Sequence, residues 1–197
     1  MGRSHAFWQH FYPSAQQFFP ESLGQTSLDE FHFAINGVEP TMIRVEADEV
    51  TYNLHIMLRF DLERDLISGK LDSQDVPTAW NDRFEADFGI RPQTDADGCL
   101  QDVHWSAGLF GYFPTYSLGN MHAAQMFESA SQTLGDLDAQ FAAGEFGPLK
   151  SWLNTNVHEH GKRFAADQLI EVITGKPLSD SALVRQLNSR FRSLYVV

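Results

Sequence analysis

The amino-acid sequence predicts a mostly α-helical domain, for two reasons. Apolar residues recur at three- and four-residue steps through most of the 197 residues, which is the spacing of helices with one buried face. Glycine or asparagine follows most of these stretches, as expected where helices end. A chain of this length buries roughly 70% of its unfolded surface, enough for a real core. We therefore expect residues 1–197 to form a single, mostly helical domain.

The first helices are marked by their ends. A short aromatic helix is expected from Ser4 to Phe11, ending before Pro13, because proline lacks the N–H that the next turn would use. A second helix should begin at Ser27-Leu28-Asp29-Glu30, which matches a capping box, and end at Asn36-Gly37.

The strongest periodicity predicts a long helix from about Arg44 to Ser68, with Gly69 as its C-terminal cap. Its expected apolar stripe consists of Ala47, Val50, Leu54, Met57, Leu58, Leu62 and Leu66. The next helix should follow Asp75 and end at Gly89, with one apolar face made by Trp80, Phe84 and Phe88.

Residues 91–116 interrupt this pattern with two prolines and three glycines. We expect a long irregular or β-containing segment here, and such segments in compact domains are usually functional. Five further helices are then expected, at residues 118–134, 137–143, 148–159, 166–174 and 181–194.

Charge and cysteine content exclude several classes of protein. The formal net charge is −12, from 26 acidic and 14 basic side chains, and an acidic surface is repelled by nucleic acid and by anionic membranes. No apolar stretch is long enough to span a membrane. The single cysteine, Cys99, rules out an internal disulfide and favours a role as a small apolar side chain. A reducing, cytoplasmic location is expected.

A self-contained helical zinc site is not predicted. Such a site needs two histidines at positions i and i+4, because these side chains meet on one helix face, and none of the eight histidines has that spacing. His158-Glu159-His160 is followed by Lys162 where a zinc helix would carry histidine. We interpret this stretch as a solvated helix end.

The irregular segment holds the most promising polar side chains. If the backbone is extended, Asp102 and His104 lie on one face, where the carboxylate could fix the tautomer of the imidazole. Tyr112 and Tyr116 follow on a backbone bent by glycine and proline, and phenols near an imidazole can stabilise an oxyanion. Equally, these side chains could be buried, satisfied polar groups of a packed loop.

Arg44 has two readings. It could pair with Asp48, four residues later on the predicted helix. Alternatively, its guanidinium could hold the carboxylate of a substrate, which it fits with two parallel hydrogen bonds. Spacing alone does not separate these two readings.

Four blocks of the sequence match the motifs of one known family: Gly2-Arg3-Ser4 with Phe7-Trp8, the run from Ile43 to Ile56, Leu100-Gln101-Asp102-Val103-His104-Trp105, and Gly111 to Gly119 followed by Ala123-Ala124-Gln125. With these blocks the chain resembles the carboxypeptidase Taq family of thermostable zinc metallocarboxypeptidases. The resemblance runs through the whole chain in order.

The resemblance implies a helical zincin-like groove fold, of which this chain would be the C-terminal part. It also implies the activity of the family, which is the removal of C-terminal residues from peptides. In that family, zinc is held by a His-Glu-x-x-His helix and by a glutamate of a later His-Glu-Ser-Gln-Ser element, and neither element occurs here. Zinc is thus implied for the full-length family and none is expected for this chain alone. The implied ligands are peptides with a free C-terminus, and a homodimer is implied as well.

The resemblance also implies roles for the remaining residues. Arg44 would clamp the terminal carboxylate of a peptide. His104, held by Asp102, would contact that carboxylate or the tetrahedral intermediate. Tyr112 or Tyr116 would stabilise the oxyanion, and the choice between them stays open. We therefore expect the substrate-binding and oxyanion side of a carboxypeptidase, inactive alone because it lacks the metal ligands and the general base.

A different class of function is the alternative. The chain could be a non-catalytic helical interaction module that binds a protein partner or associates with itself. Apolar helix faces without an intramolecular partner would then be exposed. The aromatic run from Phe7 to Phe19 is the expected contact surface.

Overall fold

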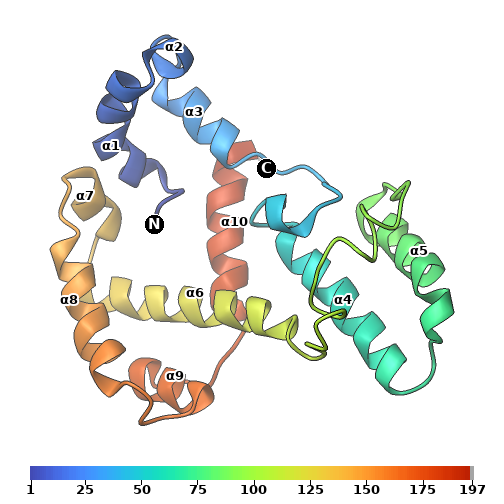
Figure 1. Cartoon of the computed structure of the whole chain (residues 1–197). Helices are drawn as coiled ribbons and strands as arrows, with labels where there is room; N and C mark the ends of the chain where they lie inside the picture. The colour runs from blue at the N-terminus through green and yellow to red at the C-terminus, as the bar shows by residue number, and fades with distance from the viewer. Residues whose placement is uncertain (196–197) are drawn as a thin grey trace. The chain divides into compact units, whose positions relative to one another are not determined.

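The computed structural model describes residues 1–195, and within that range it contains α-helices, short 3-10 helices and no strand (Figure 1). The expected mostly α fold is confirmed. The chain divides into two compact units. Unit 1 comprises residues 1–37 and those from 120 onward, and unit 2 comprises residues 38–119, so one of the two boundaries falls within a helix, at residues 119–120. The expectation that both units fold together as a single domain stays a prediction.

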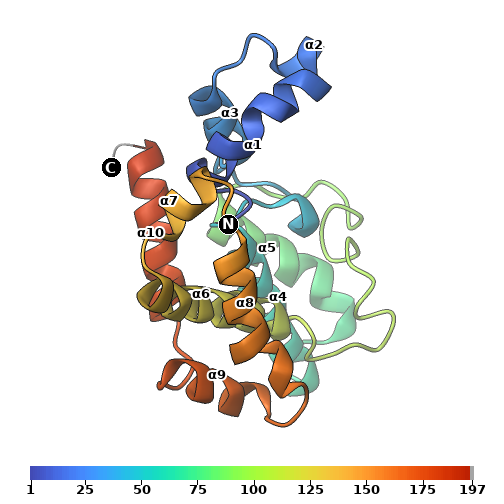
Figure 2. The ribbon, with the colours of Figure 1, turned by 90° about the vertical axis from the view of Figure 1, so that its left-hand side faces the viewer.

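Unit 1 is a set of helices around an aromatic core. Its elements are α1 (His5–Phe18), α2 (Pro20–Leu23), α3 (Leu28–Ile35), most of α6 (Pro114–Leu134), α7 (Leu137–Ala142), α8 (Gly147–Asn156), η3 (His158–His160), α9 (Ala166–Thr174) and α10 (Ser181–Tyr195). Helix α1 packs against α3 and α7 (Figure 2). Buried side chains from α6, α7 and α8 form the core: Ala130, Leu137, Phe141, Leu149 and Trp152.

Helix α1 is longer than the sequence predicts, because Pro13 lies inside it. The Ser4 side chain caps its start by accepting the N–H of Phe7. Pro13 cannot donate one backbone hydrogen bond of the helix, but packing at its neighbour offsets the loss: Tyr12 is buried and its hydroxyl donates to the carbonyl of Thr26 at 2.9 Å. The capping box at Ser27 is confirmed, and α3 ends at Asn36 as expected.

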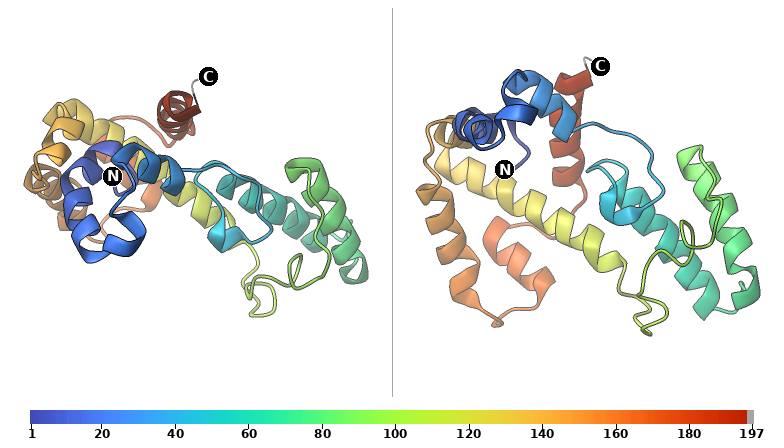
Figure 3. Two further views of the ribbon diagram at one scale, coloured as in Figure 1. Left: turned by 90° about the horizontal axis from the view of Figure 1, so that it is seen from above. Right: turned by 45° about the horizontal axis from the view of Figure 1, so that its top comes forward.

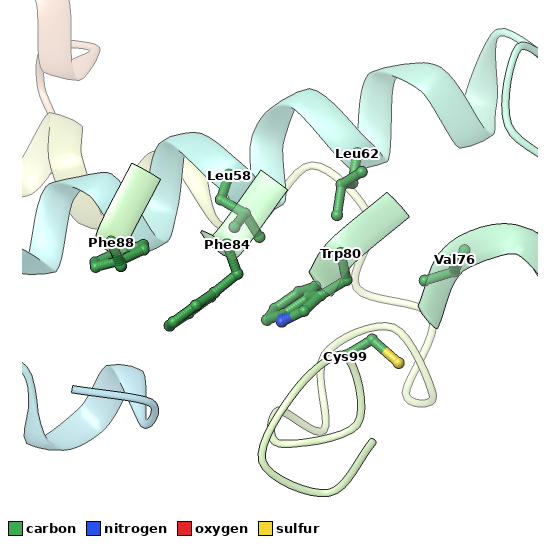
Figure 4. Close-up of a cluster of buried hydrophobic side chains, with 7 residues drawn as sticks. All are labelled: Leu58, Leu62, Val76, Trp80, Phe84, Phe88 and Cys99. Atoms are coloured by element: carbon green, nitrogen blue, oxygen red, sulfur yellow. The ribbon is translucent and has the colours of Figure 1, made fainter. Parts of the chain in front are cut away.

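Unit 2 is built on two antiparallel helices, α4 (Tyr52–Ile67) and α5 (Val76–Phe88), which lie side by side (Figure 1). Two 3-10 helices, η1 (Arg44–Glu46) and η2 (Ser73–Asp75), precede them. The core between α4 and α5 consists of Leu58, Leu62, Val76, Trp80, Phe84, Phe88 and Cys99 (Figure 4). Cys99 packs there as a small apolar side chain, as predicted, and burial raises the pKa of its thiol.

Helix α4 differs from the prediction in its start and in its buried face. It begins at Tyr52 because the Asp48 carboxylate bonds the N–H groups of Val50 and Thr51, which holds the chain in a turn before the helix. Two residues of the predicted apolar stripe are exposed, Leu54 by 37% and Met57 by 56%. The buried face instead carries polar side chains together with the leucines: His55, Arg59 and Glu63.

Residues 89–113, here named the connecting segment, join α5 to α6 without helix or strand (Figure 3). Of the two expected possibilities, irregular structure is correct. The segment bends at Gly108 and Gly111, whose φ angles of 73° and 81° suit glycine best. The later helices follow the predicted ranges closely, although α6 starts at Pro114. In residues 1–195, no helix is both long and apolar enough to cross a membrane.

Candidate functional site

Unit 2 brings a cluster of polar and aromatic side chains together where η1, α4, the connecting segment and the first turn of α6 meet. Its members are Arg44 from η1, Tyr52 and Arg59 from α4, Gln101, Asp102 and His104 from the connecting segment, and Phe113 and Tyr116 around the start of α6. Four of the five predicted site residues, all but Tyr112, are linked in this cluster by hydrogen bonds or by an ion pair.

Arg44 is buried and pairs with Asp102, not with Asp48. Its Nε donates to the Asp102 carboxylate at 3.1 and 3.3 Å, and its Nη2 donates to Oδ1 of the same carboxylate at 2.6 Å. Its Nη1 donates to the hydroxyl of Tyr52 at 3.1 Å. A guanidinium has five N–H donors, so one N–H on each terminal nitrogen has no acceptor among the described residues.

A second arginine, Arg59, reaches the same carboxylate from α4. Its Nε donates to Oδ2 of Asp102 at 2.7 Å. Its two terminal nitrogens donate to the carbonyl of His55 and to Oε1 of Gln101, both at 2.8 Å. Gln101 Oε1 also accepts the backbone N–H of Arg44 at 2.9 Å. Asp102 and Gln101 therefore hold η1 and α4 together.

Charge and burial act against each other in this cluster. Burial tends to raise the pKa of Asp102, but the hydrogen bonds and charges of Arg44 and Arg59 outweigh it and hold that pKa below its usual value. Burial lowers the pKa of Arg59 to about 10, so the side chain remains protonated at neutral pH. Burial, and then the charges of both arginines, lower the pKa of His55 to about 4, so this histidine is neutral.

His104 is buried, and its partner is Tyr116, not Asp102. Its Nε2 lies 3.1 Å from the Tyr116 hydroxyl, within hydrogen-bond distance. Its Nδ1 lies 3.9 Å from Oδ1 of Asp102, too far for a hydrogen bond, and it has no hydrogen-bond partner among the described residues. The expected carboxylate-held imidazole is thus absent from this arrangement, which leaves one ring nitrogen available.

The two candidate tyrosines differ in position. Tyr116 is half-buried, bonds His104, and lies over the Arg44 guanidinium with 5.0 Å between the ring centroid and Cζ. Tyr112 is exposed, and its ring centroid is 5.5 Å from that of His104. Of the two, Tyr116 is bonded to the cluster, and Tyr112 flanks it at the surface.

The connecting segment is fastened to α4 by a buried carboxylate. Glu63 Oε1 accepts the indole N–H of Trp105 at 2.8 Å, and Oε2 accepts the backbone N–H of Gly111 at 3.2 Å. Glu63 is 3% exposed. These two bonds lie on either side of the Gly108 bend, so they fix the loop that follows His104.

Metal binding finds no support in the part of the chain that the structure describes. Within residues 1–195, no three side chains of the His, Cys, Asp and Glu types come together as a metal would require. His158 and Glu159 are exposed in η3, as predicted for a solvated helix end. The described residues therefore do not fit a zinc site, and no step of the chemistry below involves a metal.

Sequence reasoning missed four members of the cluster, Tyr52, Arg59, Gln101 and Phe113, and it also missed Glu63, which fastens the connecting segment. Arg59 and Glu63 did carry a signal, because both occupy positions on the buried face of α4, where charged side chains occur only when they have partners. The arrangement as a whole offers a positively charged group, an imidazole nitrogen and a phenol within one cluster. Such a set binds and orients an anionic group, and it carries no nucleophile of its own.

Comparisons with known proteins point to one family. Residues 1–191 match the family described as carboxypeptidase Taq (M32) metallopeptidase. The chain is 48% identical over 195 residues to thermostable carboxypeptidase 1 of Thermus thermophilus, covering 99% of this chain and 38% of that protein. It is 43% identical over 197 residues to carboxypeptidase 1 of Bacillus subtilis, covering all of this chain and 39% of that protein.

A solved structure shows the same fold. The crystal structure of the carboxypeptidase from Deinococcus radiodurans superposes with a TM-score of 0.96 at 40% identity, over 100% of this chain and 40% of that one. The chain thus spans about two fifths of the length of the relatives that it matches, which agrees with the expectation that the resemblance covers one portion of them.

Proposed function

Because the chain belongs to the carboxypeptidase Taq family of metallopeptidases, we propose that unit 2 provides the part of a carboxypeptidase site that binds the C-terminal carboxylate of a peptide. Arg44 is the binding group, and the two N–H groups that it has left would donate to the ligand's carboxylate oxygens. His104 and Tyr116 lie beside that position and would contact the carboxylate or polarise the scissile carbonyl.

One observation carries this proposal: two guanidinium groups converge on a single buried carboxylate. The cluster thus retains one positive charge after internal pairing. Isolated buried charges are costly, so a site of this kind favours an anion. A free α-carboxylate is an anion that every peptide with a free C-terminus offers, and its planar geometry matches a guanidinium.

Titration of the chain with acetyl-alanyl-alanine tests the role of Arg44. Arg44→Gln should weaken binding by about tenfold or more, because hydrogen bonds to charged groups contribute about 1.5–3 kcal/mol. Arg83→Gln is the matched control, since Arg83 also lies in unit 2 and pairs with Asp61 and Asp87 at the surface. Equal affinity of the wild type and of Arg44→Gln would contradict the proposal.

We also propose that the chain alone does not hydrolyse peptides. Its residues position and polarise a substrate, but a nucleophile is missing from the site described above. Zinc, as the metal of the complete enzyme, and a homodimeric state follow from family resemblance alone and stay proposals, as does a cytoplasmic location. Turnover of acetyl-alanyl-alanine by the pure chain, with and without added zinc, tests the proposed inactivity.

An interaction module is the second candidate function, and one feature of unit 1 favours it. Phe18 and Phe19, at the junction of α1 and α2, are 80% and 62% exposed. Most of the aromatic run before them is used internally, since Phe7 contacts Phe146 and Trp8 contacts Phe31. Self-association that disappears in a Phe18→Ser, Phe19→Ser variant, together with no affinity for peptides, would favour this candidate over the first.

A further inference from the structure

The net charge around Asp102 is set by the two arginines that bind it. Arg44 and Arg59 both donate to this carboxylate, through separate oxygens at 2.6 and 2.7 Å. The three side chains are almost excluded from water, with exposures of 6% for Arg44, 0% for Arg59 and 11% for Asp102. One negative charge balances one of two positive charges, and the remaining positive charge is weakly screened because the surroundings are dry.

Arg59 cannot itself contact a ligand. It is fully buried, and each of its three nitrogens already donates to Asp102, to the carbonyl of His55 or to Gln101. Its Cζ lies 4.6 Å from the ring centroid of Trp80 and 5.4 Å from that of Phe113, so aromatic rings cover it as well. Any effect of Arg59 on a ligand must therefore be indirect, through its charge and through Asp102 and Gln101, which both also bond Arg44.

We infer that Arg59 is a positioning residue that sets the affinity of Arg44 for an anion by sharing the charge of Asp102. With Arg59 present, Asp102 neutralises each arginine only in part, and Arg44 keeps a net attraction for an incoming carboxylate. Without Arg59, Arg44 and Asp102 form a neutral pair, and an anion gains little there and is repelled by Asp102. This inference rests on the proposed function, because it concerns the same ligand.

A purely structural role for Arg59 makes different predictions, and three variants separate the two roles. Arg59→Met removes the charge but keeps most of the volume, leaving a neutral Arg44–Asp102 pair. Arg59→Lys keeps the charge and loses the guanidinium fork. The double variant Arg59→Met, Asp102→Asn removes one charge of each sign, so the cluster again carries one positive charge, on Arg44.

The experiment is a calorimetric titration with acetyl-alanyl-alanine at low salt, with the fold of each variant checked by near-ultraviolet circular dichroism. Arg59→Met should lose about tenfold or more in affinity, because the attraction lost with one nearby charge is weakly screened in a buried site. Arg59→Lys should retain most of the affinity. The double variant should bind more tightly than Arg59→Met, although it has lost one more native side chain.

Several results would overturn the inference. One such result is a folded Arg59→Met variant that binds the peptide as tightly as the wild type does. Another is an equal loss of affinity in Arg59→Met and in Arg59→Lys, together with a further loss of affinity in the double variant. If Arg59→Met does not fold, the inference is tested by the other two variants. If either of them folds but does not bind the peptide, the charge role of Arg59 is contradicted. No binding by the wild type overturns the proposed function and this inference together, whereas binding that is lost in Arg44→Gln but unaffected in Arg59→Met overturns only the inference.

Discussion

The carboxylate of Glu63 accepts the indole N–H of Trp105 at 2.8 Å, which joins the buried face of α4 to the connecting segment. Its second oxygen accepts the backbone N–H of Gly111 at 3.2 Å. Between these two attachment points the chain turns through Gly108, and on either side of them lie His104 and Tyr112. A single side chain thus fixes the loop that presents the predicted site residues.

Replacing Glu63 by Gln tests this attachment. The amide offers one acceptor oxygen where the carboxylate offers two, so its NH2 group would face one of the two N–H donors. A buried donor left unsatisfied costs about 1–3 kcal/mol of unfolding free energy. Urea unfolding should show a loss of that size. The exposed Glu85, which pairs with Arg91, is the control, and Glu85→Gln should cost about 1 kcal/mol or less. Equal losses in the two variants would contradict the anchoring role.

His55 predicts how stability depends on pH. Its pKa is lowered to about 4 in the folded chain, first by burial and then by the charges of Arg59 and Arg44, whereas the unfolded chain has the ordinary value near 6.5. Between these values the unfolded state binds a proton that the folded state does not, so unfolding becomes easier as pH falls. The effect is absent above about pH 7 and reaches about 2 kcal/mol at pH 5.

His55→Leu isolates this contribution. The leucine would lie beside Phe84 and Phe88, the rings that His55 contacts, and it removes two ring nitrogens that have no hydrogen-bond partner among the described residues. The difference in unfolding free energy between His55→Leu and the wild type should grow in favour of the variant as pH falls from 7 to 5. The exposed His158, replaced by Asn, is the control for the loss of one histidine. A constant difference across this range would show that His55 is not the titrating group.

Phe84 tests the core of unit 2. The side chain is fully buried, and its ring stacks on Phe88 with 4.4 Å between centroids. Phe84→Ala should cost about 3–5 kcal/mol of unfolding free energy, since it leaves a cavity under α4. Phe60 lies on α4 and is 41% exposed, so Phe60→Ala should cost about 1 kcal/mol or less. Similar costs for both would mean that α4 and α5 do not pack in solution as they do in the structure.

The sequence predicts most helices of this chain because their ends are locally encoded. The capping box at Ser27 and the left-handed Gly89 need only neighbours within one turn, and both are where the sequence places them. Pro13 is different: the helix through it persists because of packing around Tyr12, which a local pattern does not report.

The site is less predictable, for a related physical reason. Arg44 and Asp102 are 58 positions apart, and their pairing depends on how η1 and the connecting segment come together. Local spacing suggested Asp48 for Arg44 and Asp102 for His104, and in both cases a distant partner is bonded instead. Recognition of the motifs identified the residues, while the charge balance that Arg59 creates became visible only in three dimensions.

Recognition of a free peptide carboxylate by unit 2 can be measured by comparing two ligands. Wild-type chain would be titrated at low salt with acetyl-alanyl-alanine and with the corresponding C-terminal amide, which differs only in the absence of the negative charge. The acid should bind with an affinity that weakens as salt is added, and the amide should bind about tenfold or more weakly. Equal binding of acid and amide, or binding of neither, would contradict it.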